Sequence, residues 1–355
     1  MAEHHAGVGV PETLEELLTP GWLTAALAPK YPGVVVTAVA PGAVMTRVST
    51  NALFAIECEG GLPPGLPAGL CAKGYFSDTG NWAYRRAGEA EAAFYRDMAG
   101  STGVATLRSV YADVDGGTGH GVVITEDLGA AGGVFVDPAV AHTPTEVAET
   151  LEMYAVLHGR SWGRPGGRAA PWLVPRIAAT TGGRTAEDIQ AQFDGPVGTQ
   201  VPAGARDGAG LLGAYRRLPA ISEEATAWCL LHGDAHLGNL YRSASGRFGL
   251  LDWQLVQPGM WGIDVGYHVA SSLSPGDRRR CEHDLLAHYL DRRSAEGVPV
   301  PGWAEVWAGY RAGVVYGTFL WSITQKVRPE ITAVLLGRLG TAADDQGAYG
   351  LGPVR

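Results

Sequence analysis

Residues 230–239 read LLHGDAHLGN and residues 249–254 read GLLDWQ, and these two stretches decide how the rest of the chain is interpreted. In each stretch an apolar run leads directly to an acidic residue, Asp234 in the first and Asp252 in the second. Asn239 ends the first stretch and is followed by Leu-Tyr, a turn and a second apolar run, which is the pattern of a β-hairpin. Such a hairpin would bring the two carboxylates and the amide close together.

Three side chains of this kind meet the needs of phosphoryl transfer. In phosphoryl transfer the protein mainly positions the reactants and stabilises charge, and it contributes little covalent chemistry. It needs one group to accept the proton of the substrate hydroxyl, and oxygen ligands for Mg²⁺ ions that neutralise the phosphates. Two carboxylates and an amide oxygen can supply both functions. The sequence therefore predicts a phosphotransferase site at this hairpin.

The spacing is similar to the kinase signature H-R-D-L-x-x-x-N followed by D-F-G. This chain has His232-Gly-Asp234, then Asn239 at the same offset, then Asp252-Trp-Gln. Over most of its length it resembles the aminoglycoside phosphotransferase, choline kinase and ecdysteroid kinase-like superfamily. The resemblance implies that Asp234 is the catalytic base and that Asn239 and Asp252 bind Mg²⁺. It gives His236 only a loop-shaping role or a weak polar contact.

A third aspartate has a different expected role. Asp264 lies in the segment Gly262-Ile-Asp-Val-Gly266. It resembles the buried aspartate that anchors the backbone of the catalytic loop in this fold. We therefore expect Asp264 to be structural.

The order of elements before residue 129 predicts an antiparallel sheet of five strands with one inserted helix. Thr13-Leu-Glu-Glu16 is a capping-box pattern that predicts a short helix at the start. The expected strands are residues 33–40, 51–58, 70–75, 105–112 and 119–126, and the expected helix is 84–98.

Helical patterns dominate after Leu128. Thr143-Pro-Thr-Glu146 predicts a helix that continues to about His158, and residues 195–210 predict a loop. The fold class is therefore α+β, and the resemblance implies a two-lobed protein-kinase-like fold. We expect an ATP-binding lobe at residues 1–128 and a mainly helical catalytic and acceptor-binding lobe at residues 129–355.

Lys73, in the third expected strand, lies where the resemblance places a lysine for the α- and β-phosphates of ATP. Its expected partner is a glutamate on the following helix, and Glu89 and Glu91 are the candidates. Helical spacing puts Glu91 on the apolar stripe with Phe94, whereas Glu89 shares a charged face with arginines. A glutamate on an apolar face needs a partner to offset its desolvation, which favours Glu91.

Two further segments belong to the expected ATP site. Residues 40–49, APGAVMTRVS, stand between the first two strands and contain one glycine in place of a G-x-G-x-x-G string. We expect them to form the loop that covers the phosphates. Residues 125–128, TEDL, resemble the hinge whose backbone binds adenine, so Glu126 and Leu128 are expected nucleotide-binding residues.

The resemblance implies that the acceptor binds against the C-terminal helices. Residues 303–325 carry six aromatic side chains at loosely helical spacing, and aromatic rings give rigid, amphipathic contact area. The candidates for acceptor contact are Trp307, Tyr310 and Trp321, although core packing is the alternative for most of these aromatics. The expected acceptor is a small hydroxylated molecule such as an antibiotic, an amino alcohol, a sugar or a steroid-like alcohol.

Composition excludes some partners. The net charge of −9 argues against nucleic acid and anionic membranes, which bind basic surfaces. The sequence has no apolar run of about 20 residues and no export signal at its start. The four cysteines are far apart and show no metal-ligand spacing. These features predict a cytoplasmic protein.

Two alternative functions remain open at this point. A metal-dependent hydrolase could use His232, Asp234 and His236 as ligands, since His, Asp and His can hold zinc. That reading leaves Lys73 and Glu91 without a role. A non-catalytic nucleotide-binding relative of the kinases is the second alternative. The loss of a key residue would favour it, and the sequence retains every one.

Overall fold

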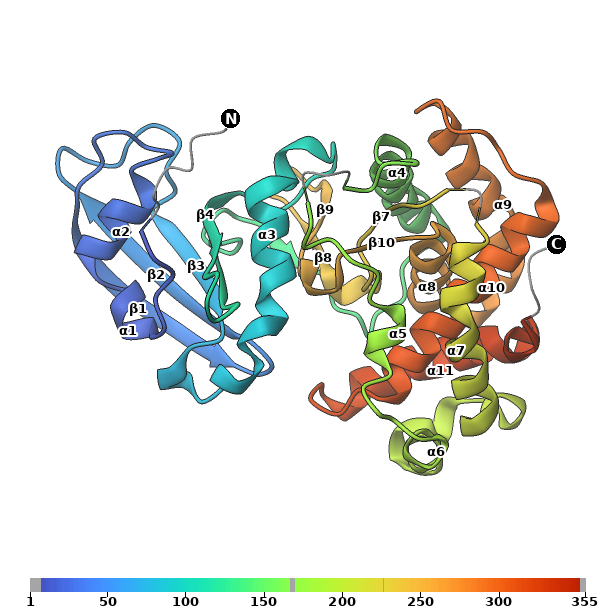
Figure 1. Cartoon of the computed structure of the whole chain (residues 1–355). Coiled ribbons are helices and arrows are strands. Elements are labelled where there is room, and N and C mark those ends of the chain that lie inside the picture. The colour runs from blue at the N-terminus through green and yellow to red at the C-terminus, as the bar shows by residue number, and fades with distance from the viewer. Residues whose placement is uncertain (1–7, 167–169, 226, 352–355) are drawn as a thin grey trace. The chain divides into compact units, whose positions relative to one another are not determined.

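The computed structural model describes residues 8–166, 170–225 and 227–351, which form two compact units (Figure 1). The first unit contains the chain up to Ser101 together with Thr106–Val134 and Arg242–Arg247. The second contains Thr102–Ala105, Phe135–Tyr241 and the chain from Phe248 onward. We predicted an ATP-binding lobe at residues 1–128 and a catalytic and acceptor-binding lobe at residues 129–355. That assignment of functions remains a prediction.

A five-stranded antiparallel sheet forms the centre of the first unit, as the sequence predicted. Its spatial order is β1-β2-β3-β5-β4, and every neighbouring pair is antiparallel. The strands are β1 (Val36–Thr46), β2 (Thr50–Cys58), β3 (Gly69–Gly74), β4 (Ser109–Val114) and β5 (Gly121–Glu126).

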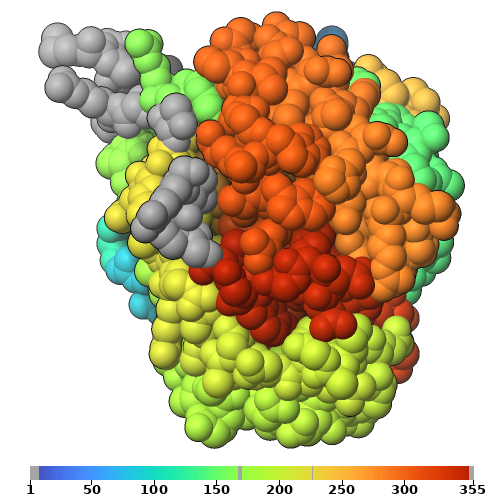
Figure 2. Space-filling view, turned by 90° about the vertical axis from the view of Figure 1, so that its right-hand side faces the viewer, coloured from blue at the N-terminus to red at the C-terminus, as the bar shows by residue number. Residues whose placement is uncertain are grey.

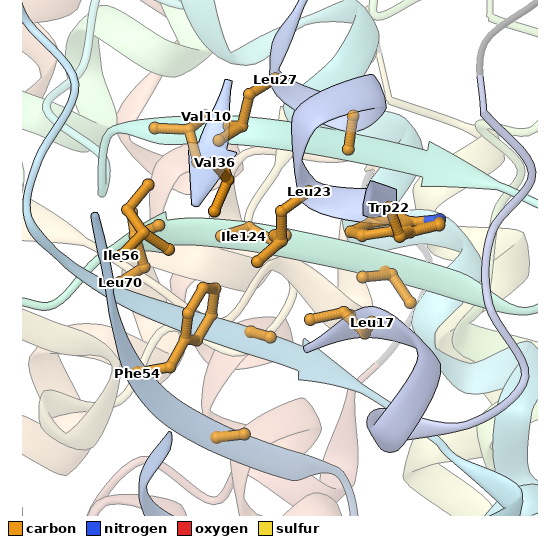
Figure 3. Close-up of a cluster of buried hydrophobic side chains, with 14 of the residues drawn as sticks. Leu17, Trp22, Leu23, Leu27, Val36, Phe54, Ile56, Leu70, Val110 and Ile124 are labelled. Carbon is orange, nitrogen blue, oxygen red and sulfur yellow. The ribbon is translucent and has the colours of Figure 1, made fainter. Parts of the chain in front are cut away.

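Two short helices, α1 (Leu14–Leu17) and α2 (Pro20–Leu27), pack on one face of this sheet. The Thr13 hydroxyl caps α1 by accepting a hydrogen bond from the Glu16 N–H at 3.1 Å, as the capping pattern predicted. Helix α2 was not predicted from the sequence. Apolar side chains of both helices meet those of the strands in a buried cluster, which stabilises the unit by removing apolar surface from water. Figure 3 shows Leu17, Trp22, Leu23, Leu27, Phe54, Ile56, Leu70 and Ile124 in this cluster.

The opposite face of the sheet carries Lys73. Side chains alternate along β3, so that Leu70 and Ala72 enter the apolar cluster while Lys73 points to the other side. Helix α3 (Glu89–Asp97) packs against β4 and β5. It begins later than predicted, because residues 82–88 form a 3-10 helix before it.

The expected phosphate-covering loop at residues 40–49 is mostly strand, which corrects the sequence prediction. β1 continues to Thr46 and β2 begins at Thr50, so only a tight turn separates them. The pairing of the two strands is irregular between Pro41 and Val44. A bulge of this kind accommodates a proline and a glycine that would otherwise end a strand.

Helices make up most of the second unit. The Thr143–Glu146 capping box is present and opens α4, which runs from Pro144 to Arg160. Figure 2 shows one face of this unit, with α9 above α11 and the segment around α6 below them. The other helices are α5 (Ile177–Thr180), α6 (Ala186–Asp194), α7 (Gly208–Glu223), α8 (Gly262–Ser272), α9 (Pro275–Ser294), α10 (Trp303–Ser322) and α11 (Pro329–Asp345). Residues 195–207, expected to be a loop, form two short 3-10 helices with connecting turns.

Helices α8 and α10 approach each other closely because glycines line their contact. A Cβ atom on Gly313 would collide with the Gly262 carbonyl, and one on Gly317 would collide with the ring of Tyr267. Side chains at these positions would therefore push the helices apart. This packing sets where Tyr267 of α8 lies relative to α10.

The remaining short strands form two small sheets. β7 (Cys229–Leu231) pairs with β10 (Gln257–Gly259), and the order β6-β8-β9 describes the other small sheet. Its strands are β6 (Val134–Phe135), β8 (Leu240–Arg242) and β9 (Phe248–Leu250). β8 and β9 form the hairpin that the sequence predicted after Asn239. None of the helices in the described part of the chain combines the length and apolar character of a transmembrane span.

Candidate active site

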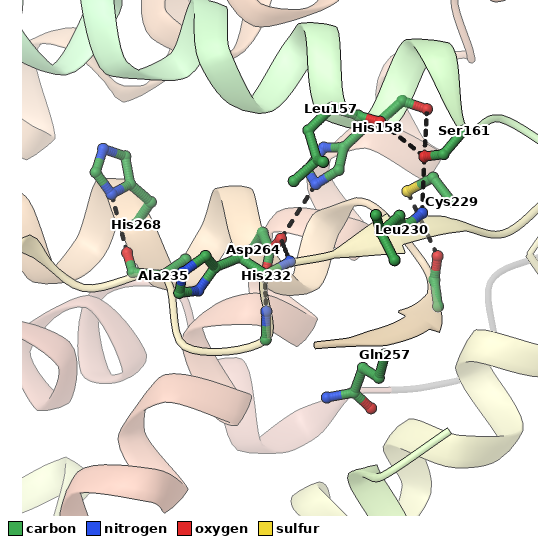
Figure 4. Close-up of polar contacts among 12 residues, drawn as sticks. Leu157, His158, Ser161, Cys229, Leu230, His232, Ala235, Gln257, Asp264 and His268 are labelled. Carbon is green, nitrogen blue, oxygen red and sulfur yellow. Dashed lines mark hydrogen bonds and ion pairs between the residues drawn. The ribbon is translucent and has the colours of Figure 1, made fainter. Parts of the chain in front are cut away.

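A buried aspartate holds the loop that follows β7. The backbone N–H groups of His232 and Gly233 donate to the Asp264 carboxylate at 2.7 and 2.9 Å. Asp264 is fully buried and also contacts His158 Nε2 at 3.1 Å (Figure 4). Gly233 has a φ of +80°, a conformation that a residue with a Cβ rarely adopts. The prediction that Asp264 anchors this loop is confirmed.

His232 is fully buried, and the backbone uses both of its ring nitrogens. Nδ1 accepts a hydrogen bond from the Asp234 N–H at 3.2 Å, and Nε2 donates to the Leu251 carbonyl at 3.0 Å. Burial lowers the pKa of His232 and so favours this neutral form. The imidazole therefore shapes the loop.

The same contacts disfavour the hydrolase alternative. A zinc site made of His232, Asp234 and His236 would need a ring nitrogen from each imidazole. His232 has none to offer, and His236 Nδ1 already accepts from the Gly238 N–H at 3.0 Å. Within residues 8–166, 170–225 and 227–351, no three His, Cys, Asp or Glu side chains are grouped as metal ligands.

The carboxylate of Asp234 is partly open to solvent, with 26% of its side-chain surface exposed. Oδ1 accepts a hydrogen bond from the Tyr267 hydroxyl at 3.0 Å, and Oδ2 lies 3.6 Å from His236 Nε2. Burial by itself would raise the pKa of Asp234, but His236, His232 and the Tyr267 hydroxyl outweigh it and hold the pKa below its ordinary value. An ionised, reachable carboxylate is suited to act as a general base.

Asn239 and Asp252 lie beside each other next to the β8–β9 hairpin. The Leu251 N–H donates to the Asn239 carbonyl at 3.0 Å, and Asp252 follows directly. Asn239 Nδ2 donates to the Asp234 carbonyl at 2.8 Å. The side-chain nitrogen of Asn239 is therefore engaged in a hydrogen bond within the protein. The side-chain oxygen of Asn239 is the atom that could bind a cation.

The conformation of Asp252 is strained. With a φ of 63°, it is the one non-glycine residue with positive φ in the described part of the chain. Such a conformation costs about 1–2 kcal/mol and occurs most often at functional sites. A carboxylate and an amide oxygen are hard ligands of the kind that Mg²⁺ accepts. Asp252 and Asn239 therefore fit a magnesium ion.

In the first unit, Lys73 and Glu91 form an ion pair. Lys73 Nζ lies 2.7 Å from Glu91 Oε2, and their side chains are 17% and 5% exposed. Glu91 belongs to the buried face of α3, whereas Glu89 is half-buried. The structure thus pairs Lys73 with the glutamate that helical spacing selected. In the sheet, Lys73 of β3 is in register with Asn51 of β2 and Val123 of β5.

Glu126 and Leu128 lie at the end of β5. The Glu126 N–H donates to the Arg108 carbonyl, and the Leu128 carbonyl accepts from the Gly133 N–H, both at 2.9 Å. The Leu128 N–H donates to no group in the described chain. The Leu128 side chain is buried.

The three aromatic candidates on α10 divide into two sets. Trp321 Nε1 donates to the Tyr267 hydroxyl at 2.6 Å, and its ring packs edge-on against His236. Tyr310 instead donates to Glu282 at 2.8 Å, and Trp307 stacks on His283. Tyr310 precedes Trp321 by eleven residues, about 16 Å along a helix. The structure brings Trp321 to the Asp234 loop and places Trp307 and Tyr310 elsewhere.

Two residues that contact the Asp234 loop, Tyr267 and Tyr316, were not predicted from the sequence. Tyr267 bonds Asp234, and Tyr316 donates from α10 to the Gly233 carbonyl at 2.8 Å. Tyr267 could have been found, because it stands three residues after Asp264 and so shares its face of the helix. Tyr316 carried no comparable signal, since it looked like any other aromatic residue of α10.

Comparisons with known proteins establish the fold and the family of the chain. Choline kinase from Cryptosporidium parvum aligns with 93% of this chain and 98% of its own, with a TM-score of 0.54 and 13% identity. The chain therefore has the α+β protein-kinase-like fold that the sequence predicted. Residues 79–306 match the profile of the phosphotransferase enzyme family, which is more than half of the chain. The chain belongs to this family.

Other solved structures align with the chain at lower scores. Plasmodium vivax ethanolamine kinase covers 96% of this chain and 92% of its own, with a TM-score of 0.49 and 10% identity. An aminoglycoside phosphotransferase from Alicyclobacillus acidocaldarius covers 97% and 96%, with a TM-score of 0.48 and 15% identity. No curated protein sequence gave a match.

Proposed function

We propose that this chain is a kinase that moves the γ-phosphoryl group of Mg²⁺-bound ATP onto a hydroxyl of a small molecule. One observation carries the proposal. Asp234 presents a partly exposed carboxylate on a loop that buried Asp264 anchors. The Asn239 amide bonds the backbone of that loop, and the Asn239 carbonyl pairs with Leu251, the residue before Asp252. Membership of the phosphotransferase family supports the same reaction class.

Asp234 is the proposed base of the reaction. Its carboxylate accepts the proton of the acceptor hydroxyl as that oxygen attacks the γ-phosphorus. A new oxygen–phosphorus bond forms and the bond to the β–γ bridging oxygen breaks, so that ADP leaves with the electron pair. A Mg²⁺ ion bound by Asn239 and Asp252 would neutralise charge on the phosphates.

Residues of the first unit are the proposed contacts for the nucleotide. Lys73 would bind the α- and β-phosphates, with Glu91 holding the ammonium in place. The Leu128 N–H would donate to the adenine ring, and Glu126 would contribute through its backbone. Since the reaction consumes ATP, we place the enzyme in the cytoplasm.

The proposed acceptor is a small hydroxylated molecule. Antibiotics, amino alcohols, sugars and steroid-like alcohols are the classes to compare, and a role in antibiotic resistance would follow only from the first. Of the three aromatic candidates for acceptor contact, Trp321 is the one that packs against His236 beside Asp234, although its ring is buried. The structure gives no such support for Trp307 and Tyr310.

A screen of these four acceptor classes tests the proposal. ADP release is measured with Mg²⁺ and ATP, and each positive is repeated without Mg²⁺ and with the Asp234→Asn variant. We expect at least one acceptor to raise ADP release in a manner that requires both Mg²⁺ and Asp234. Turnover that persists in the variant would remove the proposed base, and zinc-dependent turnover without ATP would restore the hydrolase alternative.

A further inference from the structure

Asp234 stands at the end of a chain of two hydrogen bonds that starts on α10. Trp321 Nε1 lies 2.6 Å from the Tyr267 hydroxyl, and that hydroxyl lies 3.0 Å from Asp234 Oδ1. All three residues belong to the second unit, with Tyr267 on α8 and Trp321 on α10 (Figure 1). Tyr267 is fully buried, and Trp321 is 3% exposed.

The direction of both hydrogen bonds follows from the groups involved. An indole N–H can only donate, so the Tyr267 oxygen accepts from Trp321. The single phenol proton then goes to Asp234, since an ionised carboxylate can only accept. Oδ1 of Asp234 is therefore occupied by a charge-assisted hydrogen bond, which is stronger than a neutral one.

The other carboxylate oxygen is left for the substrate. Oδ2 of Asp234 lies 3.6 Å from His236 Nε2, which is beyond the length of a hydrogen bond. A hydroxyl proton taken by Asp234 would therefore go to Oδ2. The two carboxylate oxygens of Asp234 therefore have different surroundings, because the Tyr267 hydroxyl donates to Oδ1 alone.

Contacts within the protein hold the backbone around Tyr267. Asp264, three residues earlier on α8, holds the loop that carries Asp234. Gly317 of α10 leaves room for the Tyr267 ring, since a Cβ there would collide with it. Asp234 is thus held through its loop and through its side chain from one helix.

We propose that Tyr267 is a positioning residue that fixes the Asp234 carboxylate and reserves Oδ2 for the acceptor proton, and that Trp321 acts by holding the Tyr267 hydroxyl. This inference rests on the proposed function of Asp234 as the base. Misplacing a catalytic group by even about 1 Å can cost 10²-fold in rate. The competing interpretation is that Asp234 merely satisfies the hydrogen-bonding need of a buried tyrosine.

The test compares Tyr267→Phe, Trp321→Phe and the double variant, using ADP release with water and with the acceptor from the screen. We expect Tyr267→Phe to lower kcat about 10- to 100-fold, the range for a hydrogen bond to a charged group. The KM for Mg²⁺-bound ATP should change by less than about twofold, because the interaction concerns the transfer step. Trp321→Phe should lower kcat less than Tyr267→Phe.

The double variant separates positioning from packing. If Trp321 acts through the Tyr267 hydroxyl, the double variant will have nearly the kcat of Tyr267→Phe, so the effects will not add. Tyr349→Phe is the matched control, because its hydroxyl donates to the Ala205 carbonyl at 3.0 Å. We expect it to retain full activity. Melting temperatures show whether each variant is folded.

The outcomes also separate this inference from the proposed function. If Asp234→Asn is inactive while Tyr267→Phe has the wild-type kcat, the positioning role is wrong and the base assignment survives. Additive losses in the double variant would likewise overturn the role given to Trp321. If the wild type releases no ADP, or Asp234→Asn retains turnover, the proposed function fails and this inference with it.

Discussion

Two carboxylates of the second unit each accept a hydrogen bond from a buried tyrosine, yet their surroundings differ. Tyr310 donates to Glu282 at 2.8 Å, and Tyr267 donates to Asp234 at 3.0 Å. Glu282 is also bonded to Arg278 at 2.6 Å, and its side chain is 10% exposed. Asp234 is 26% exposed, and its other neighbour is the imidazole of His236 at 3.6 Å.

This difference shows what separates a structural carboxylate from a reactive one. The charge of Glu282 is compensated within the protein by Arg278, which also bonds Asp345. A carboxylate paired in this way has little left to offer a substrate. The Asp234 carboxylate is instead partly exposed, and its Oδ2 has a histidine at 3.6 Å in place of an arginine. Helix α10 contributes a residue to the surroundings of each carboxylate. Tyr310, in the middle of the helix, bonds Glu282, and Trp321, near its end, bonds Tyr267 beside Asp234.

The largest predicted effect is on catalysis at Asp234. Asp234→Asn keeps the shape of the side chain but removes the base, so kcat should fall about 10³-fold, within the range for general-base catalysis. The matched change Glu282→Gln should leave kcat near that of the wild type, because Glu282 touches no reacting group. Steady-state ADP release measures both.

Melting temperatures supply the control for this pair. We expect Asp234→Asn to melt close to the wild type and Glu282→Gln to melt lower, because its amide replaces a charge that Arg278 needs. Equal losses of activity in the two variants would erase the proposed distinction between the carboxylates.

A smaller loss of activity is predicted when the Lys73–Glu91 ion pair of the first unit is changed. Lys73 balances Glu91 in the free protein, but its proposed target is the phosphates of ATP. Lys73→Met should lower kcat/KM about 10²-fold, the cost of removing one group that stabilises developing charge. Glu91→Gln should cost less, because the ammonium remains. Unchanged kcat/KM in Lys73→Met would show that the lysine is structural.

The third predicted effect concerns magnesium. Asp252→Asn retains a side chain that tolerates the positive φ of this position but removes a charged ligand. The Mg²⁺ concentration for half-maximal ADP release should rise at least about 10-fold. A titration with Mg²⁺ at saturating ATP measures it, with Asp344→Asn on α11 as a surface control. An identical titration curve for Asp252→Asn and the wild type would exclude Asp252 as a ligand.

The smallest effect on catalysis is predicted for Arg278→Met. This change leaves Glu282 and Asp345 without their buried cation and should lower the free energy of unfolding by about 3 kcal/mol. Chemical denaturation followed by circular dichroism measures that loss. The folded variant should keep the wild-type kcat. A stable variant with reduced kcat would mean that this cluster belongs to the site.

Much of the fold could be predicted because its signals are local. Apolar runs, one of them clearly alternating, indicated five strands, and the Thr143 capping box marked the start of α4. The extension of β1 was missed because Pro41 and Gly42 usually end a strand. Only pairing with β2, which includes a bulge, makes the strand continue. Such tertiary compensation has no signature in the local sequence.

The candidate site was predictable where its residues are close in sequence or on one helix face. Asp234, Asn239 and Asp252 follow apolar runs, and Glu91 was selected by helical spacing. The link from Trp321 through Tyr267 to Asp234 joins side chains 33 and 54 residues apart. Helical periodicity cannot say which end of α10 meets the loop, so Trp307, Tyr310 and Trp321 looked equivalent.

The most direct test of the central claim follows the phosphoryl group itself. Phosphorus NMR of ATP, Mg²⁺, enzyme and the acceptor from the screen should show ADP and a phosphate monoester appearing in equal amounts. Asp234→Asn should show neither at the same enzyme concentration. Monoester formation that continues in this variant, or ATP that stays intact with wild-type enzyme and every acceptor class, would contradict the account.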